Sequence, residues 1–245
     1  MTTGGIVLDF AILGPVEVRA DGEPVPISAA KLRTLLAALL LRPGRTVPTS
    51  TLIEQVWGDR PPQRGVAALQ NYVMRLRQAL GGSLIRTTPG GYSISVSPAQ
   101  LDLTRFSQLT ADAATGSPAT RARLLTAALA LWRGPALEGV PSPVLQRAEV
   151  PRLEELRLTA VEMRIDAELE LGRHAALVPE LRSLTAQHPL RERLWHQLML
   201  ALRRSGRRAE ALAAYRSVSE FLAEELGLDP GPELREQFAA ILQAS

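Results

Sequence analysis

The first twenty residues contain short runs in which hydrophobic and polar side chains alternate, as they do in strands that bury one face. Two such runs span residues 8–12 and 16–19. Asp21-Gly22 follows them, and this pair favours the tight turn of a β-hairpin. We therefore expect a small antiparallel sheet at the start of the chain.

From residue 28 onward the hydrophobic positions take on the spacing of helices. The pattern predicts a first helix over 28–41 with Ser28 as its cap, a second from Pro48 to Gly58, and a third over about 62–80. A Pro-Gly-Gly turn between two strand-like runs then predicts a hairpin over 84–96. Sheet, three helices and hairpin, in this order, are typical of a winged helix-turn-helix.

The third predicted helix has two distinct faces. Its hydrophobic residues recur at spacings of four, three and four, which places them on one face: Leu69, Val73, Leu76 and Leu80. A step of 100° per residue places a polar and small-residue set opposite them: Arg64, Ala67, Asn71, Met74, Arg75 and Gln78.

After residue 98 strand patterns give way to a series of helical ones. The sequence around Gly172, LGRHAAL, returns in similar form around Gly206, SGRRAEAL, offset by 34 residues. This is the period of tetratricopeptide repeats, in which stacked helix pairs share one core. We therefore expect two domains, an α+β winged helix-turn-helix over 1–97 and an all-α tetratricopeptide-like domain over 101–245.

Charge separates the two halves. Residues 1–100 hold 10 Lys or Arg and 6 Asp or Glu, a net charge of +4, whereas residues 101–245 hold 18 and 19, a net charge of −1. The tract from Arg60 to Leu101 holds five arginines and no acidic residue. A positive surface of this kind suits a polyanion, because neutralising phosphates releases condensed counterions. A merely solvated basic surface is the alternative.

Side chains on the open face of the third helix suit the DNA major groove. Asn71 and Gln78 carry amides that can pair with adenine, Arg64 and Arg75 can donate to guanine or phosphate, and Ala68 permits close approach. The alternative is an ordinary amphipathic helix, although solvated helix faces usually carry acidic residues as well.

The predicted hairpin adds donors for phosphate. Arg86, Thr87 and Thr88 offer a guanidinium and two hydroxyls, and Gly90 lets the backbone approach closely. Tyr92 either stacks on a sugar or anchors the hairpin on the core, with anchoring favoured. Two residues of the first helix, Lys31 and Arg33, either contact phosphate or are plain surface charges.

Several classes of function find no support. The chain has no cysteine, and its three histidines lack metal-ligand spacing, so we expect neither a metal nor a cofactor. It also lacks the Gly-x-Ser-x-Gly and Gly-x-Gly-x-x-Gly patterns, so we expect no catalytic residues and no enzyme. No apolar run approaches the ~20 residues of a membrane span, and the first ten residues do not resemble a signal peptide. A cytoplasmic protein is expected.

Several motifs carry a resemblance to a known family. Residues 52–58 (LIEQVWG), 75–77 (RLR) and 85–92 (IRTTPGGY) resemble the OmpR/PhoB-type winged helix. Residues 10–16 (FAILGPV), joined to that domain, resemble the Streptomyces antibiotic regulatory protein (SARP) family. The second half resembles the bacterial transcriptional activation domain that follows in this family, through residues 130–134, 152–157, 188–192 and 226–234.

The resemblance implies a transcriptional activator of secondary-metabolite genes that binds direct repeats in double-stranded DNA and recruits RNA polymerase holoenzyme, near its sigma factor. It implies two protomers on one DNA face, hence a homodimer at least on DNA. The chain has no Gly-x4-Gly-Lys-Ser/Thr motif, so it resembles the family's short form without a nucleotide-hydrolysing module.

In the OmpR-type fold the loop between the second and third helices faces polymerase. That loop corresponds here to Gly58, Asp59, Arg60, Pro61, Pro62 and Gln63, with a plain linker as the alternative. A different function for the whole chain also stays open: a tetratricopeptide-like adaptor for proteins, with the basic domain as a nonspecific DNA tether.

Overall fold

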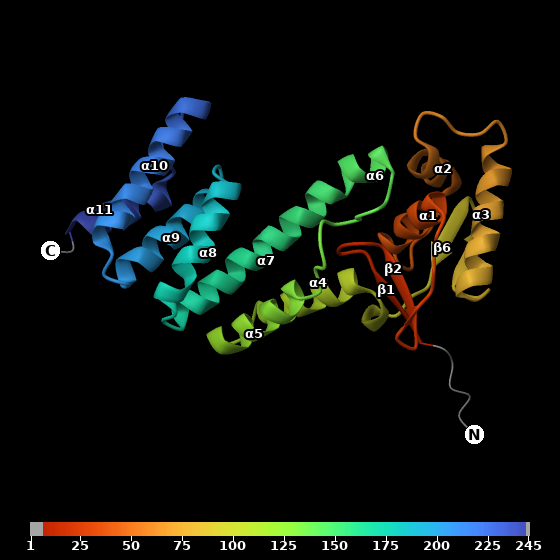
Figure 1. Cartoon of the computed structure of the whole chain (residues 1–245), viewed down its shortest axis with the longest axis horizontal. Coiled ribbons are helices and arrows are strands. Elements are labelled where there is room, and N and C mark those ends of the chain that lie inside the picture. Colours follow the sequence, from red (N-terminus) through yellow and green to blue (C-terminus); the bar gives the residue numbers. More distant parts are fainter. Residues whose placement is uncertain (1–6, 244–245) are drawn as a thin grey trace, which may run out of the picture. The chain divides into compact units, whose positions relative to one another are not determined.

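The computed structural model describes residues 7–243 (Figure 1). The first six residues, on which the expectation of no signal peptide partly rests, and the last two lie outside the described residues. Contacts divide the chain into two compact units. Unit 1 holds the chain up to Ala111 together with Ala127–Leu158, and unit 2 holds Asp112–Thr126 together with the chain from Thr159 onward.

Unit 1 begins with the predicted antiparallel sheet. Strands β1 (Leu8–Ala11), β2 (Glu17–Ala20) and β3 (Glu23–Pro24) pair in that order. Asp21 and Gly22 between β2 and β3 have φ angles of 51° and 88°, the left-handed geometry that a tight hairpin turn requires. The predicted hairpin is confirmed.

The winged helix follows. Helices α1 (Ala30–Leu40), α2 (Thr49–Trp57) and α3 (Gly65–Leu80) pack on one another. A second antiparallel sheet joins β4 (Val47–Pro48), β6 (Gly91–Ile94) and β5 (Ile85–Thr88), in this spatial order. The hydrophobic positions of the predicted helices fill the shared core, with Leu35, Leu36, Leu39, Leu52, Leu69 and Leu76 fully buried. The predicted fold class is confirmed.

Two helix starts differ from the prediction. The third helix begins at Gly65 rather than near residue 62, because Pro61 and Pro62 hold the preceding chain extended and Arg64 has a non-helical ψ of 56°. The first helix begins at Ala30 after the capping residue Ala29, which forms no side-chain cap, and the predicted cap Ser28 lies one residue before Ala29.

The rest of the described chain is helical. It comprises the single-turn η1 (Pro98–Gln100) and the helices α4 (Asp102–Ala113), α5 (Pro118–Leu129), α6 (Pro143–Ala148), α7 (Val150–Glu170), α8 (His174–Gln187), α9 (Glu192–Arg204), α10 (Arg208–Leu226) and α11 (Pro232–Gln243). Glu149 separates α6 from α7.

The 34-residue echo corresponds to equivalent turns in the helical region. Gly172 follows α7 and Gly206 follows α9, and their φ angles of 81° and 75° are both left-handed. In unit 2, α8 packs on α9, and α9 packs on α10 and α11. Among the described residues, no helix is long and apolar enough to cross a membrane.

Within unit 1, the start of α4 is bound to the first sheet. The carboxylate of Asp102 accepts hydrogen bonds from the backbone N–H groups of Ile12 and Leu13, both at 2.8 Å, and from that of Leu103 at 2.7 Å. Burial raises the pKa of Asp102, and these backbone donors oppose that rise. The carboxylate thus accepts hydrogen bonds from two buried backbone amides that the carbonyl oxygens of a neighbouring strand would otherwise accept.

The segment from Ala127 to Leu158 adds further contacts within unit 1. Ser142 Oγ donates to the carbonyl oxygen of Gln55 in α2 at 2.5 Å, and Arg42 Nη2 lies 2.6 Å from Glu149 Oε1. Leu137 N donates to the Ile12 carbonyl oxygen at 3.1 Å. The compact units therefore divide the chain differently from the domain boundary expected at residues 97–101.

Candidate nucleic-acid interface

Helix α3 buries one face and leaves the other open. Its buried residues are Leu69, Val73, Leu76 and Leu80, as the pattern predicted. Its exposed residues fall in pairs four positions apart: Val66 and Ala67, Gln70 and Asn71, Met74 and Arg75, Gln78 and Ala79. The exposed pairs therefore form one stripe along the helix, opposite the core.

Aromatic rings support the middle of this stripe. The rings of Tyr72 in α3 and Trp57 in α2 pack with centroids 5.7 Å apart. The Arg75 guanidinium carbon lies 5.9 Å from the centroid of the Tyr72 ring, within the range of a cation–π contact. Arg75 is thus held beside its own helix while its side chain stays open to solvent.

The wing is tied to α3 through Arg77. Its Nε donates to the carbonyl oxygen of Ile85 at 2.9 Å, and its Nη2 donates to Thr87 Oγ1 at 2.8 Å. Sequence reasoning missed this positioning role, because the spacing of residues 77 and 87 does not show that they are neighbours. Thr87 is exposed, whereas the hydroxyl of Thr88 is buried and finds no hydrogen-bond partner among the described residues.

Two adjacent glycines at the turn of the wing have different roles, Gly90 in the turn itself and Gly91 at the start of β6. Gly90 is exposed with a φ of 81°, a geometry that disfavours other residues. Gly91 is buried against β4, and a Cβ there would lie 2.1 Å from the carbonyl oxygen of Val47. The small size of Gly91 thus serves packing within the domain. Tyr92 is only 7% exposed, which favours anchoring over stacking on a sugar.

Two predicted phosphate contacts bind the protein's own backbone. Lys31 Nζ donates to the Val56 carbonyl oxygen at 2.5 Å, near the C-terminal end of α2, where free carbonyls attract a cation. Arg33 Nη1 donates to the carbonyl oxygens of Ile27 and Ser28, at 3.1 Å and 2.8 Å. These contacts favour a structural role for both residues.

The loop between α2 and α3 is open to solvent. Gly58 ends α2 with a φ of 61°, and every residue from Asp59 to Arg64 is exposed. The loop is visible in Figure 1 as the extended connection between the two helices. Two consecutive prolines restrict its backbone, so it presents a preorganised surface.

Among the predicted DNA-contacting residues, one set is open to solvent on α3, directly before it and in the wing. Arg64, Asn71, Arg75, Gln78 and Arg86 are all exposed, and Ala68 is half-buried beside them. Exposure also identifies Val66 and Gln70, which the sequence prediction left out, because a step of 100° per residue places both nearer to the buried face than Ala67 or Asn71.

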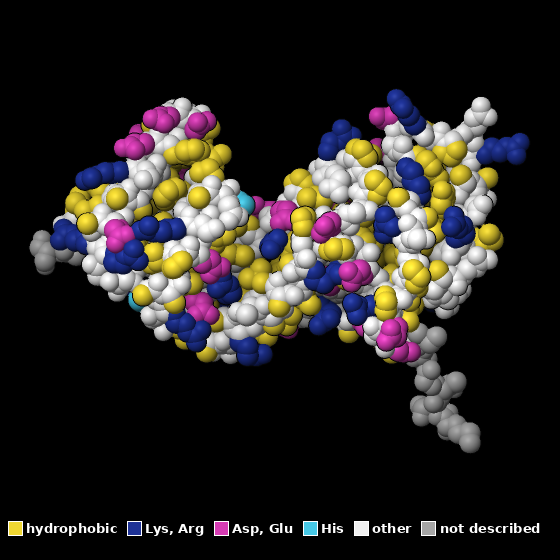
Figure 2. All heavy atoms as spheres, in the orientation of Figure 1, with side chains coloured by type: hydrophobic (Ala, Val, Ile, Leu, Met, Phe, Trp, Pro, Cys, Tyr) yellow, Lys and Arg dark blue, Asp and Glu magenta, His cyan; other side chains and the backbone are white. Residues whose placement is uncertain are grey.

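The charge around this stripe has one sign. No acidic residue occurs from Arg60 to Leu101, so α3 and the wing carry only arginines and uncharged side chains. In Figure 2 the region of α2 and α3 shows mainly basic side chains among uncharged ones, and acidic side chains gather at the end of α10. The described residues contain no cluster of three or more potential metal ligands.

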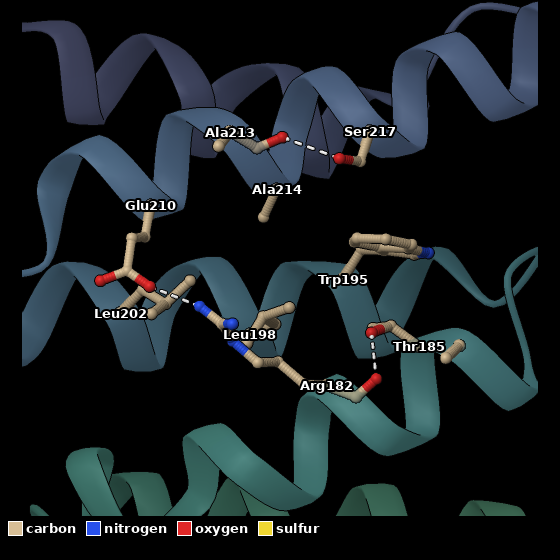
Figure 3. A pocket seen from close by; sticks show the side chains of 10 residues that line it. Arg182, Thr185, Trp195, Leu198, Leu202, Glu210, Ala213, Ala214 and Ser217 are labelled. Atoms are coloured by element: carbon tan, nitrogen blue, oxygen red, sulfur yellow. Dashed lines mark hydrogen bonds and ion pairs between the residues drawn. The ribbon is translucent and has the colours of Figure 1, made fainter.

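Unit 2 contains a groove of a different character. A cavity of about 330 Å³ lies between α8, α9 and α10. Figure 3 shows Trp195, Leu198 and Leu202 facing Ala213 and Ala214 across it. An ion pair between Arg182 and Glu210 crosses one end. Its lining offers apolar contact and few free polar groups.

Two family models match the chain. The model described as "Transcriptional regulatory protein, C terminal" matches residues 22–94, and the one described as "Bacterial transcriptional activator domain" matches residues 101–242. The first match covers the three helices and the wing, so the proposed DNA-facing residues lie inside it.

Similar proteins are regulators. Regulatory protein AfsR of Streptomyces coelicolor is 46% identical over 97% of this chain, which spans only 24% of the length of that relative. Regulatory protein DnrI of Streptomyces peucetius is 39% identical, with 97% of this chain and 93% of DnrI covered. Both are named as regulators rather than enzymes.

A solved structure supports the fold. Mycobacterium tuberculosis EmbR, solved in complex with a low-affinity phosphopeptide, superposes with a TM-score of 0.93 at 36% sequence identity. The match covers 98% of this chain and 66% of the EmbR chain.

Proposed function

We propose that this chain, which belongs to the Streptomyces antibiotic regulatory protein family of transcriptional regulators, is a sequence-specific DNA-binding activator. One observation carries the proposal: the exposed stripe of α3 presents guanidinium and amide groups in a tract of 42 residues without an acidic side chain, from Arg60 to Leu101. A DNA duplex offers phosphates to the guanidinium groups, and it offers base edges to the guanidinium and the amide groups alike.

Each group has a role that its chemistry suits. Asn71 and Gln78 donate to and accept from adenine edges, and Arg75 contacts guanine or phosphate. Arg64 at the start of α3 and Arg86 in the wing bind phosphates on the two sides of the groove. Gly90 and Thr87 lie at the wing's surface, where the backbone and a hydroxyl can add phosphate contacts.

The family suggests how the activator works. Two protomers bind direct repeats about one helical turn apart, which places both on one DNA face. The exposed loop from Gly58 to Gln63 contacts RNA polymerase holoenzyme near its sigma factor. The target genes belong to secondary-metabolite pathways. Such an activator works on the chromosome, in the cytoplasm.

The test measures sequence preference and its dependence on the stripe. The full chain selects duplexes from a random pool, and gel shifts compare the parent with Arg75→Ala and Arg86→Ala on a selected duplex. Arg75→Ala is expected to weaken binding about 5- to 150-fold and Arg86→Ala to reduce the salt dependence by about one phosphate contact. Arg216→Ala, an exposed arginine of α10, is the matched control.

Two results would contradict the proposal. Unchanged DNA affinity in both variants at moderate salt would show that the assigned face does not bind DNA. A selected duplex preferred over random DNA by far less than the ~10³-fold typical of specific proteins would favour the adaptor with a nonspecific tether. The groove of unit 2 (Figure 3) would then be the first surface to examine for a protein partner.

A further inference from the structure

Two large side chains on the open stripe of α3 can form no strong hydrogen bond. Val66 is 53% exposed and Met74 is 50% exposed, although the helix has a core to bury such residues in. Single exposed apolar side chains are common on proteins. Met74 differs because it lies among Gln70, Asn71 and Arg75, on the surface proposed to face DNA, and Val66 lies one turn before Gln70 at the start of the same helix.

We propose that Met74, together with Val66, recognises thymine by packing against its 5-methyl group in the major groove. This inference rests on the proposed function. Among the four bases only thymine presents a methyl group at the major-groove edge, and apolar side chains contact it there. The flexible thioether of methionine adapts its shape to such a contact.

The position of Met74 strengthens its part in the proposal. It lies one turn after Gln70 and Asn71 and one turn before Gln78, so it lies among the groups proposed to bind base edges. An amide that binds adenine places its neighbour near the thymine of the same or an adjacent pair. We therefore expect Met74 to contact the thymine of an A·T pair within the amide-recognised part of the site.

The spacing of the two side chains sets a second expectation. Val66 and Met74 are eight positions apart, which corresponds to about 12 Å along a helix. At about 3.4 Å per base pair this spans three to four base pairs. The two contacted thymines should therefore be separated by about that distance in each half-site.

A protein partner is a less suitable occupant of this stripe. The two apolar side chains are separated by the polar Gln70 and Asn71, so they form no continuous apolar patch of the kind that protein interfaces use. The surrounding tract also lacks any acidic residue. Single apolar side chains that lie between hydrogen-bonding side chains suit a base edge, which offers one methyl group beside hydrogen-bonding groups.

The experiment replaces thymine by deoxyuridine, which keeps every hydrogen-bonding group and removes only the methyl. Each thymine of a selected duplex is changed in turn, and the dissociation constant of the full chain is measured. The parent is expected to lose about fourfold in affinity at the thymine that Met74 contacts, the effect of one buried methyl group. Met74→Ala should bind the unmodified duplex less tightly and lose that penalty.

Two variants serve as controls. Met74→Leu keeps an apolar side chain of similar size and should retain the penalty. Leu190→Ala removes an exposed leucine of unit 2, 55% exposed, and should leave every penalty unchanged.

The outcomes separate this inference from the proposed function. Specific binding without a deoxyuridine penalty at any position would overturn the inference and leave the proposed function standing. A penalty of the same size in the parent, Met74→Ala and Val66→Ala would overturn the assignment to these residues. Loss of transcription in Met74→Ala without any deoxyuridine penalty would identify the stripe as a protein contact. A parent that shows no sequence preference would instead contradict the proposed function.

Discussion

A methyl group added at Gly91 would lie 2.1 Å from the carbonyl oxygen of Val47. The atoms that it would meet belong to the backbone of β4, so they cannot rotate aside as a side chain can. Gly91→Ala must therefore push β6 away from β4, and we expect it to lower the free energy of unfolding by about 1–3 kcal/mol, as overpacking does. Urea denaturation followed by circular dichroism measures the change. Because β6 carries the wing, DNA affinity should fall as well.

The control for this change is Gly82→Ala. Gly82 is exposed, and an added Cβ meets no atom within 4 Å. The control should therefore remain within about 0.5 kcal/mol of the parent. Equal stability of Gly91→Ala and the parent would show that β4 and β6 separate freely, and the close packing would then have no energetic consequence.

At this scale, periodicity predicted which α3 residues are buried and most of those that are open, but it left out Val66 and Gln70. It did not predict hydrogen-bond partners. Lys31 and Arg33 carry the positive charge of phosphate ligands, yet each donates to backbone carbonyl oxygens that folding brings near it. Arg77 had no predicted role, yet it donates to Ile85 and Thr87 across the junction of α3 and the wing.

At the scale of elements, the loop between α2 and α3 gives a prediction that separates two activities. Its residues from Asp59 to Arg64 are exposed, while the stripe of α3 begins after it. Replacing Pro61 and Pro62 with glycine frees the loop backbone, which costs about 0.4–1 kcal/mol per residue to reorder. If polymerase binds this loop, transcription from a selected promoter should fall roughly 4- to 30-fold.

DNA affinity is the internal control for the loop. We expect the double glycine variant to bind the selected duplex within about twofold of the parent, because α3 and the wing keep their packing. In vitro transcription and a gel shift on the same duplex measure the two activities. Unchanged transcription would identify the loop as a plain linker, and an equal loss of both activities would place it in the DNA interface.

The elements themselves were largely predictable from local signals. Glycines at 172 and 206 marked equivalent turns, and the Asp21-Gly22 pair marked a hairpin. The start of α3 was not, since helical periodicity continues through Pro62 and only the restriction that proline imposes on its neighbours argues against a helix there.

At the scale of the molecule, the association of Asp102 and of residues 127–158 with the winged-helix part of the chain was not visible in the sequence. The contacts join positions far apart, such as Ser142 with Gln55 and Asp102 with Ile12. Backbone groups form half of each pair, and every residue has those groups. The change of composition after residue 98 coincides with the gap between the two family matches, at residues 94 and 101, and it gives no sign that residues 127–158 pack with the first half.

This association predicts that a fragment of residues 1–97 is less stable than a fragment of residues 1–158, which keeps all of unit 1. The shorter fragment loses the Asp102 carboxylate, and the amides of Ile12 and Leu13 then lack their acceptor. Hydrogen bonds to a charged group contribute about 1.5–3 kcal/mol each, so we expect a difference of at least about 3 kcal/mol in urea denaturation. Asp102→Asn in the longer fragment should lie between the two, because its one oxygen can still accept from Ile12 and Leu13, whereas its NH2 group then faces the N–H of Leu103. Equal stability of the two fragments would show that the winged helix is complete by residue 97, and that the helical segment rests on it without stabilising it.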